Sequence, residues 1–166
     1  MWSFLCVFQL ASAANAPYEF DLPPQKFLST GLTGGGNLGA PSGSGFIGLE
    51  SSYTVATPGK WVGATTGFSV DVGQGQTLFT LGPKFGVLAF GVDGGLGVRT
   101  IRKFGSDMGV LVRPQLNLGL LAIFYRYGYW PSENGLPHTH QLGLTVKIPK
   151  ALTYSPRTFD VSQQEQ

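Results

Sequence analysis

Period-two alternation is the feature that most limits what this chain can fold into. Apolar residues alternate with small or polar ones in successive runs, which is the pattern of β-strands with two chemically different faces. The clearest run covers Lys60 to Val72, where Val62, Phe68 and Val70 share one face and glycine, serine and threonine occupy most of the other. No segment of ten or more residues combines a helical period with capping signals, so we expect almost no helix.

About eight runs have this pattern. They cover Lys26 to Gly35, Ser44 to Ala56, Lys60 to Val72, Gln76 to Gly86, Phe90 to Ile101, Met108 to Asn117, the stretch from the turn near Leu118-Gly119 to Trp130, and His138 to Ile148. Most runs are 10 to 13 residues long, close to the roughly 9–11 that a tilted strand needs to cross a bilayer and longer than the roughly 5–6 usual in soluble proteins. The prediction is an all-β fold, a closed antiparallel up-and-down transmembrane β-barrel over residues 26–148.

The composition of the two faces decides which one points outward. The chain has 25 glycines and only 12% charged residues, against roughly 7% glycine and 25% charge in average soluble domains. An eight-stranded barrel is barely wide enough inside for side chains, so small residues there make room for a few long ones. The apolar face then meets lipid, and closure bonds every backbone group. A soluble lipocalin-like barrel remains the alternative. Glycine gathers on the predicted inner face at Gly48, Gly63, Gly67, Gly82, Gly91, Gly95, Gly97 and Gly143.

Aromatic residues lie near the ends of several runs. Outer-membrane barrels carry aromatic girdles where the wall meets the two lipid–water interfaces. We therefore expect such a girdle from Tyr53, Trp61, Phe90, Tyr127, Tyr129 and Trp130.

The amino-terminal segment reads as an export signal over residues 1–13. An apolar run from Trp2 to Leu10 precedes Ala11-Ser12-Ala13, the small-residue pattern that signal peptidase cleaves. No Lys or Arg precedes the run, which suggests a start further upstream, and a buried core segment is the alternative interpretation. Residues 14–25 are then a periplasmic linker. Residues 149–166 form a polar carboxy-terminal tail, since Pro149 and Pro156 are expected to break any strand.

Several kinds of chemistry are excluded by residue counts. The single cysteine, Cys6, leaves with the predicted signal, so the mature chain would lack thiol catalysis and cysteine-based zinc sites. The net charge of +2 arises without any Lys/Arg cluster, so no nucleic-acid partner is expected.

The charged residues of the predicted strands fall mainly on the inner face. Charges enclosed in a narrow lumen must be paired and hydrogen-bonded, so the first interpretation is an ion-pair network that fills the barrel. A narrow anion-preferring pathway is the second, because rings of Arg and Lys favour anions. The predicted lumen-lining residues are Glu50, Asp71, Lys84, Asp93, Arg99, Arg113, Gln115, Arg126 and Lys147.

One group of residues around the last loop suggests catalysis. Ser132, Glu133, His138 and His140 supply a hydroxyl, an acid and imidazoles, the groups that general-base hydrolysis uses. The His-Thr-His spacing does not reproduce the His-x-Ser order of lipid A deacylases, and turn contacts explain the serine and glutamate more simply. The two histidines could share a metal, but no third ligand is evident. We therefore expect no catalytic residues, no metal and no cofactor.

The phrases LGPKFG (81–86) and GVDGGLGVR (91–99), within the alternating pattern, resemble the small eight-stranded outer-membrane β-barrel proteins of Gram-negative bacteria, the OmpA/OmpX type and its porin-like relatives. The resemblance implies a monomer in the outer membrane, with lipid and lipopolysaccharide as partners and both termini in the periplasm. It favours a structural or narrow small-solute pore role over the two alternatives, a lipid A-modifying hydrolase and a soluble periplasmic ligand-binding barrel. One departure is that such proteins commonly end on their last strand, whereas 18 residues follow Ile148 here.

Overall fold

The chain folds into a closed eight-stranded antiparallel barrel, which confirms the predicted fold class. The computed structural model describes residues 24–38, 44–73, 75–102, 105–131 and 137–152. Each strand pairs with its sequence neighbour, and β1 pairs with β8 to close the barrel. The predicted signal, most of the linker and most of the tail lie outside the described residues. The strands are β1 (Gln25–Leu38), β2 (Gly45–Thr57), β3 (Lys60–Asp71), β4 (Gln76–Val87), β5 (Phe90–Ile101), β6 (Gly105–Leu118), β7 (Leu121–Tyr129) and β8 (His138–Ala151).

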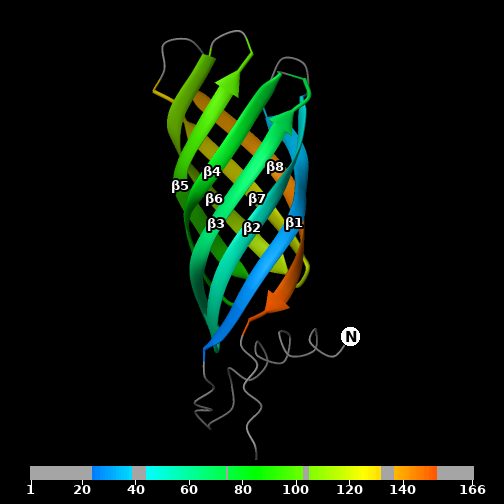
Figure 1. Ribbon diagram of the computed structural model, residues 1–166, viewed down its shortest axis with the longest axis vertical. Coiled ribbons are helices and arrows are strands. Elements are labelled where there is room, and N and C mark those ends of the chain that lie inside the picture. The colour runs from blue at the N-terminus through cyan, green and yellow to red at the C-terminus, as the bar shows by residue number, and fades with distance from the viewer. Residues whose placement is uncertain (1–23, 39–43, 74, 103–104, 132–136, 153–166) are drawn as a thin grey trace, which may run out of the picture.

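The two ends of the barrel differ in how the strands are connected (Figure 1). At the end where β1 begins and β8 finishes, here called the terminal end, the strands are joined by tight two-residue turns. Gly59 supplies one of them with a φ of 73°, in the left-handed region that glycine adopts without steric cost. The longer connections lie at the opposite end, here called the loop end (Figure 1).

The last strand is longer than the sequence predicted. It continues past Ile148 through Pro149 to Ala151, and these residues pair with β1. The prediction that Pro149 would break the strand is wrong because the missing N–H is not needed there. The N–H of Lys147 bonds toward β7, at the carbonyl of Leu120, whereas that of Leu152 bonds to Lys26 in β1. The backbone nitrogen of Pro149 points the same way as that of Lys147, toward β7. Because β7 begins only at Leu121, it has no residue opposite Pro149.

The other boundary corrections have local causes. Strand β1 begins at Gln25, inside the predicted linker, and runs to Leu38 rather than Gly35. Strand β6 begins at Gly105, three residues before the predicted start at Met108. Its first residues are polar on both faces, which hides the alternation. There Ser106 lies 2.9 Å from the hydroxyl of Thr100 in β5, a cross-strand hydrogen bond that extends the pairing.

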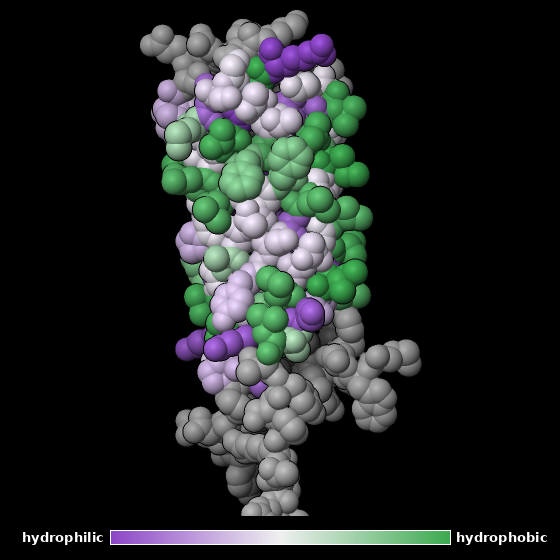
Figure 2. Space-filling model, in the orientation of Figure 1, coloured by the Kyte–Doolittle hydropathy of each residue, from purple (hydrophilic) through white to green (hydrophobic). Residues whose placement is uncertain are grey.

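The wall has the two faces that the alternation predicted. Outward-facing Leu, Ile, Val and Phe side chains are exposed over every strand, with Leu81 57% and Leu96 60% exposed at the middle of β4 and β5. Inward-facing side chains are mostly buried and polar. Figure 2 shows hydrophobic side chains gathered over the wall, while strongly hydrophilic ones lie mainly toward the two ends. Among the described residues, no helix is long and apolar enough to cross a membrane.

Candidate functional site

Most of the charged residues of the strands lie in the barrel lumen. The structure places all nine predicted lumen residues on the inner face, and eight of them are buried; the ninth, Lys147, has 12% of its side chain exposed. The eight buried ones are Glu50, Asp71, Lys84, Asp93, Arg99, Arg113, Gln115 and Arg126.

Four of these residues form a charge-balanced group, here called the central cluster: Glu50, Asp93, Arg113 and Lys147. The guanidinium of Arg113 donates from Nη1 to Glu50 and from Nε and Nη2 to Oδ2 of Asp93, with the Nε bond at 3.0 Å. Lys147 pairs with the second oxygen of Glu50. Two carboxylates thus face two cations contributed by β2, β5, β6 and β8. Because a buried charge is tolerated only when it is paired and hydrogen-bonded, the cluster ties four strands together across the lumen.

Two further cations lie in the lumen without a carboxylate partner among the described residues. Lys84 donates to the hydroxyl of Ser52 at 3.1 Å. Arg126 donates from Nη1 to the side-chain oxygen of Gln141 at 3.0 Å. Its guanidinium carbon also lies 5.2 Å from the ring centre of Phe124 and 5.7 Å from that of Phe46, within cation–π range. Both cations thus have neutral hydrogen-bond acceptors, and Arg126 also has aromatic faces, but neither has an opposite charge within ion-pair distance among the described residues.

An indole and a cation close the lumen at the loop end. The ring of Trp130 is fully buried, and the guanidinium carbon of Arg99 lies 4.6 Å from its centre. Arg99 also pairs with Asp107 at 2.9 Å. Glycine makes room for the indole: a Cβ at Gly109 would lie 2.4 Å from the ring, and one at Gly128 would lie 2.9 Å from it.

A second indole, that of the half-buried Trp61, lies at the terminal end. Trp61 extends into the lumen beside Lys84, whose Nζ lies 5.3 Å from the ring centre, and donates its indole N–H to the carbonyl of Leu88 at 3.1 Å. A Cβ at Gly86 or Gly91 would approach the indole to 2.2 Å. Glycines on the inner face therefore seat the two large rings, which gives a direct geometric reason for part of the glycine surplus.

The predicted aromatic girdle is wrong for its two tryptophans. Trp61 and Trp130 do not face outward with the other members, although Tyr53, Phe90 and Tyr129 are exposed on the outer wall. The alternation along each strand indicates this direction, because residues two apart in a strand have the same parity and point to the same side. Trp61 has the parity of Gly63 in its strand, and Trp130 has the parity of the inward Gly128. Parity is therefore a better guide to the direction of these two side chains than closeness to a strand end.

The predicted list of lumen residues leaves out most of the uncharged polar lining, although the alternation puts that lining on the inner face. Gln141 links Arg126 to the loop end: its amide donates to Asn37 at 2.7 Å, and Asn37 in turn donates to the carboxylate of Asp71. These residues carry no charge and so did not stand out, although their parity placed them inside. The buried polar residues missed are Ser29, Thr33, Ser44, Ser52, Thr65, Ser69, Gln76, Gln141 and Thr145.

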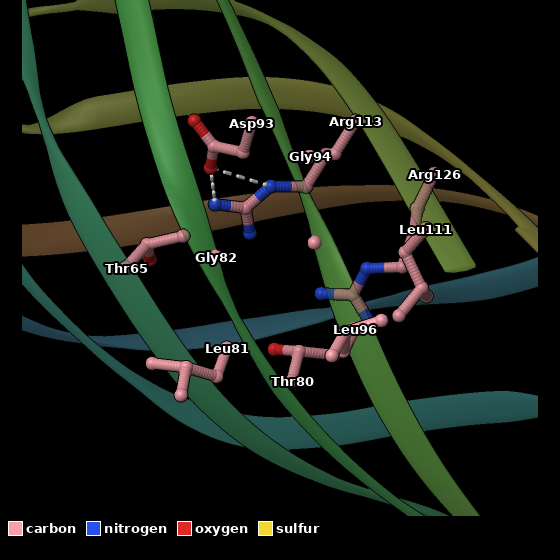
Figure 3. A pocket seen from close by; sticks show the side chains of 11 residues that line it. Thr65, Thr80, Leu81, Gly82, Asp93, Gly94, Leu96, Leu111, Arg113 and Arg126 are labelled. Atoms are coloured by element: carbon pink, nitrogen blue, oxygen red, sulfur yellow. Dashed lines mark hydrogen bonds and ion pairs between the residues drawn. The ribbon is translucent and has the colours of Figure 1, made fainter. Parts of the chain in front are cut away.

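Two hollows lie along the described strands. One cavity of about 30 Å³ is lined by Thr65, Thr80, Asp93, Arg113 and Arg126 together with apolar wall residues (Figure 3). That volume suits one or two water-sized occupants. A larger apolar hollow of about 580 Å³ is lined by residues of the five consecutive strands β4 to β8. Most of these residues, such as Phe85 and Phe90, point outward.

The histidines of the last strand lie on the outer face at the loop end. The Nδ1 of His140 lies 2.5 Å from the hydroxyl of Tyr125, and that of His138 lies 2.7 Å from the hydroxyl of Tyr127. Ser132 and Glu133 lie outside the described residues. Within the described ranges, no three His, Cys, Asp or Glu side chains gather as metal ligands would.

Comparison with known proteins adds little to this geometry. No protein-family model matches the chain, and no curated protein matches it in sequence. One solved structure, titled "De novo design of transmembrane beta-barrels", is similar over 76% of this chain and 98% of its own, with 12% identity and a TM-score of 0.43. A likeness this weak carries no argument, so the functional interpretation depends on the barrel's own residues.

Proposed function

We propose that this protein is an integral, monomeric β-barrel of the Gram-negative outer membrane whose filled lumen gives it a structural rather than a transport role. The observation that carries the proposal is the inversion of its two faces. Large apolar side chains are exposed around the whole wall, while most of the charged residues of the strands are enclosed. Lipid favours this arrangement, because the outer face of a membrane barrel must be apolar across the hydrocarbon region.

The enclosed residues favour a closed barrel over a conducting one. The central cluster crosses the lumen, and an indole stacked near a cation lies at each end. The cavity of about 30 Å³ beside Arg126 accommodates one or two waters rather than a hydrated solute. If the lumen opened, its surplus of cations would select anions, which keeps a narrow anion pathway as the second candidate.

The soluble alternative is disfavoured by the same distribution. A lipocalin-like barrel keeps its apolar side chains inside and holds a ligand there. Here the buried hydrophobic side chains are few, and the large apolar ones point outward. Lipid and lipopolysaccharide are therefore the partners that the wall suits best.

Two experiments test the proposal. The protein should be recovered from detergent-extracted outer membranes and should migrate differently on gels before and after heating, as folded membrane barrels do. Recovery from the aqueous periplasmic fraction would refute the membrane placement. In planar bilayers the folded protein should show no stepwise conductance in KCl, and reproducible anion-selective steps would replace the structural role by the pathway.

A separate experiment tests the non-enzymatic role. If the barrel does not act on lipid A, replacing His138 and His140 together by alanine should leave the mass spectrum of lipid A unchanged relative to the wild-type strain and a strain lacking the protein. Acyl chains lost in the wild type but retained in both other strains would establish the hydrolase instead.

A further inference from the structure

The lumen contains a buried cation that its protein surroundings do not neutralise. The central cluster balances itself, since Glu50 and Asp93 face Arg113 and Lys147. Arg126 lies outside that balance, is only 6% exposed, and makes no ion pair with any described residue. One of its five N–H donors is used, by Gln141. Enclosing a guanidinium with no counter-charge is costly, so the environment of Arg126 favours a bound anion.

The small cavity lies against this guanidinium. Figure 3 shows the side chains of Arg126 and Arg113 extending toward the same space, with Thr65 and Thr80 beside it. The hydroxyls of both threonines hold only long hydrogen bonds to backbone carbonyls, 3.4 Å for Thr65 and 3.5 Å for Thr80. Either hydroxyl can therefore turn to donate into the cavity at little cost.

Asp93 also lines the cavity, but its charge is already matched. One oxygen accepts two N–H groups of Arg113, and the other accepts the amide of Gln115 at 3.1 Å. The net charge left at the cavity is therefore that of Arg126. The volume of about 30 Å³ accommodates one monatomic anion or one to two waters. Water fits but cannot neutralise the charge.

We propose that this cavity is a chloride site, in which a single halide ion pairs with Arg126 and accepts a hydrogen bond from Thr80 or Thr65. The ion acts as a structural counter-ion for the lumen and is not a permeant. The inference extends the filled lumen of the proposed function, but its test uses the full-length barrel folded in detergent and so does not depend on where the protein resides.

The test compares melting in chloride and in gluconate, a much larger anion, at constant ionic strength. For an affinity of about 50 mM, raising chloride from about 5 mM to about 500 mM should raise the melting temperature of the wild type by about 3–5 °C. Arg126→Gln, which keeps a polar group toward Gln141, should lose this response. Lys84→Met is the matched control, because Lys84 is a second buried cation without an ion pair that does not line the cavity. It should retain the response.

A wild type that melts at the same temperature in both salts would overturn the proposal, as would an equal response in all three proteins. Should Arg126→Gln fail to fold, crystals of the wild type grown in sodium bromide decide the matter. An anomalous peak beside the guanidinium of Arg126 supports the site, and a cavity without one refutes it.

Discussion

Removing one member of the central cluster should destabilise the barrel far more than removing a surface charge. Glu50 is 2% exposed and pairs with both Arg113 and Lys147. Glu50→Gln keeps the shape but leaves Lys147 without its carboxylate and Arg113 with only Asp93. Breaking a buried ion pair from one side typically costs about 3–5 kcal/mol, and we expect a loss in that range.

Urea unfolding of the refolded barrel, followed by tryptophan fluorescence, measures this loss. With an m-value of about 2 kcal/mol/M, the midpoint should fall by about 1.5–2.5 M. Adding Lys147→Met to Glu50→Gln should recover at least about 1 kcal/mol, because one stranded cation is then gone. Lys150→Gln, which changes an exposed cation at the terminal end, should stay within about 0.5 kcal/mol of the wild type. A midpoint for Glu50→Gln within about 0.3 M of the wild type would refute the reasoning, because the carboxylate would then be dispensable.

Two further predictions concern the seats of the indoles and the outer wall. Gly91→Val should prevent the barrel from closing around Trp61, since even a Cβ at this position would lie 2.2 Å from the ring. The fraction of protein that shows heat-modifiable migration on gels should then fall to near zero. Gly36→Ala is the control and should fold normally, because the nearest atom to its Cβ would be 4.0 Å away. Leu81→Lys places a charge at the middle of the wall and should cost about 2–4 kcal/mol in vesicles, against about 0–1 kcal/mol for Ile148→Lys near the terminal end. Equal costs at the two wall positions would argue against a lipid-facing belt.

Much of the architecture could be predicted from the sequence because one physical pattern determines it. The period of two indicates both where a strand lies and which face each residue occupies. The sequence alone therefore places Glu50, Asp93 and Arg113 inside a barrel. Prediction failed where two signals competed. Closeness to a strand end suggested an outward Trp61, although parity places it inside, and the rule against proline in strands took no account of the unpaired side of β8 at Pro149.

The pairing inside the lumen could not be predicted at all. Which cation meets which carboxylate depends on the stagger between strands that lie far apart in sequence, as with Glu50 in β2 and Arg113 in β6. Alternation within a single strand carries no information about that stagger. The same limit hid the isolation of Arg126, which is apparent only after its neighbours are known to be paired elsewhere.

In the proposed membrane barrel, the apolar face meets lipid while the charged face lines the lumen. Nitroxide labels at position 81 or 96, introduced as Leu81→Cys or Leu96→Cys with Cys6 replaced by serine, test it most directly in reconstituted vesicles. Both labels should collide readily with dissolved oxygen and scarcely with a water-soluble nickel chelate. Free access of the nickel chelate to both labels would contradict it, because these side chains would then face water.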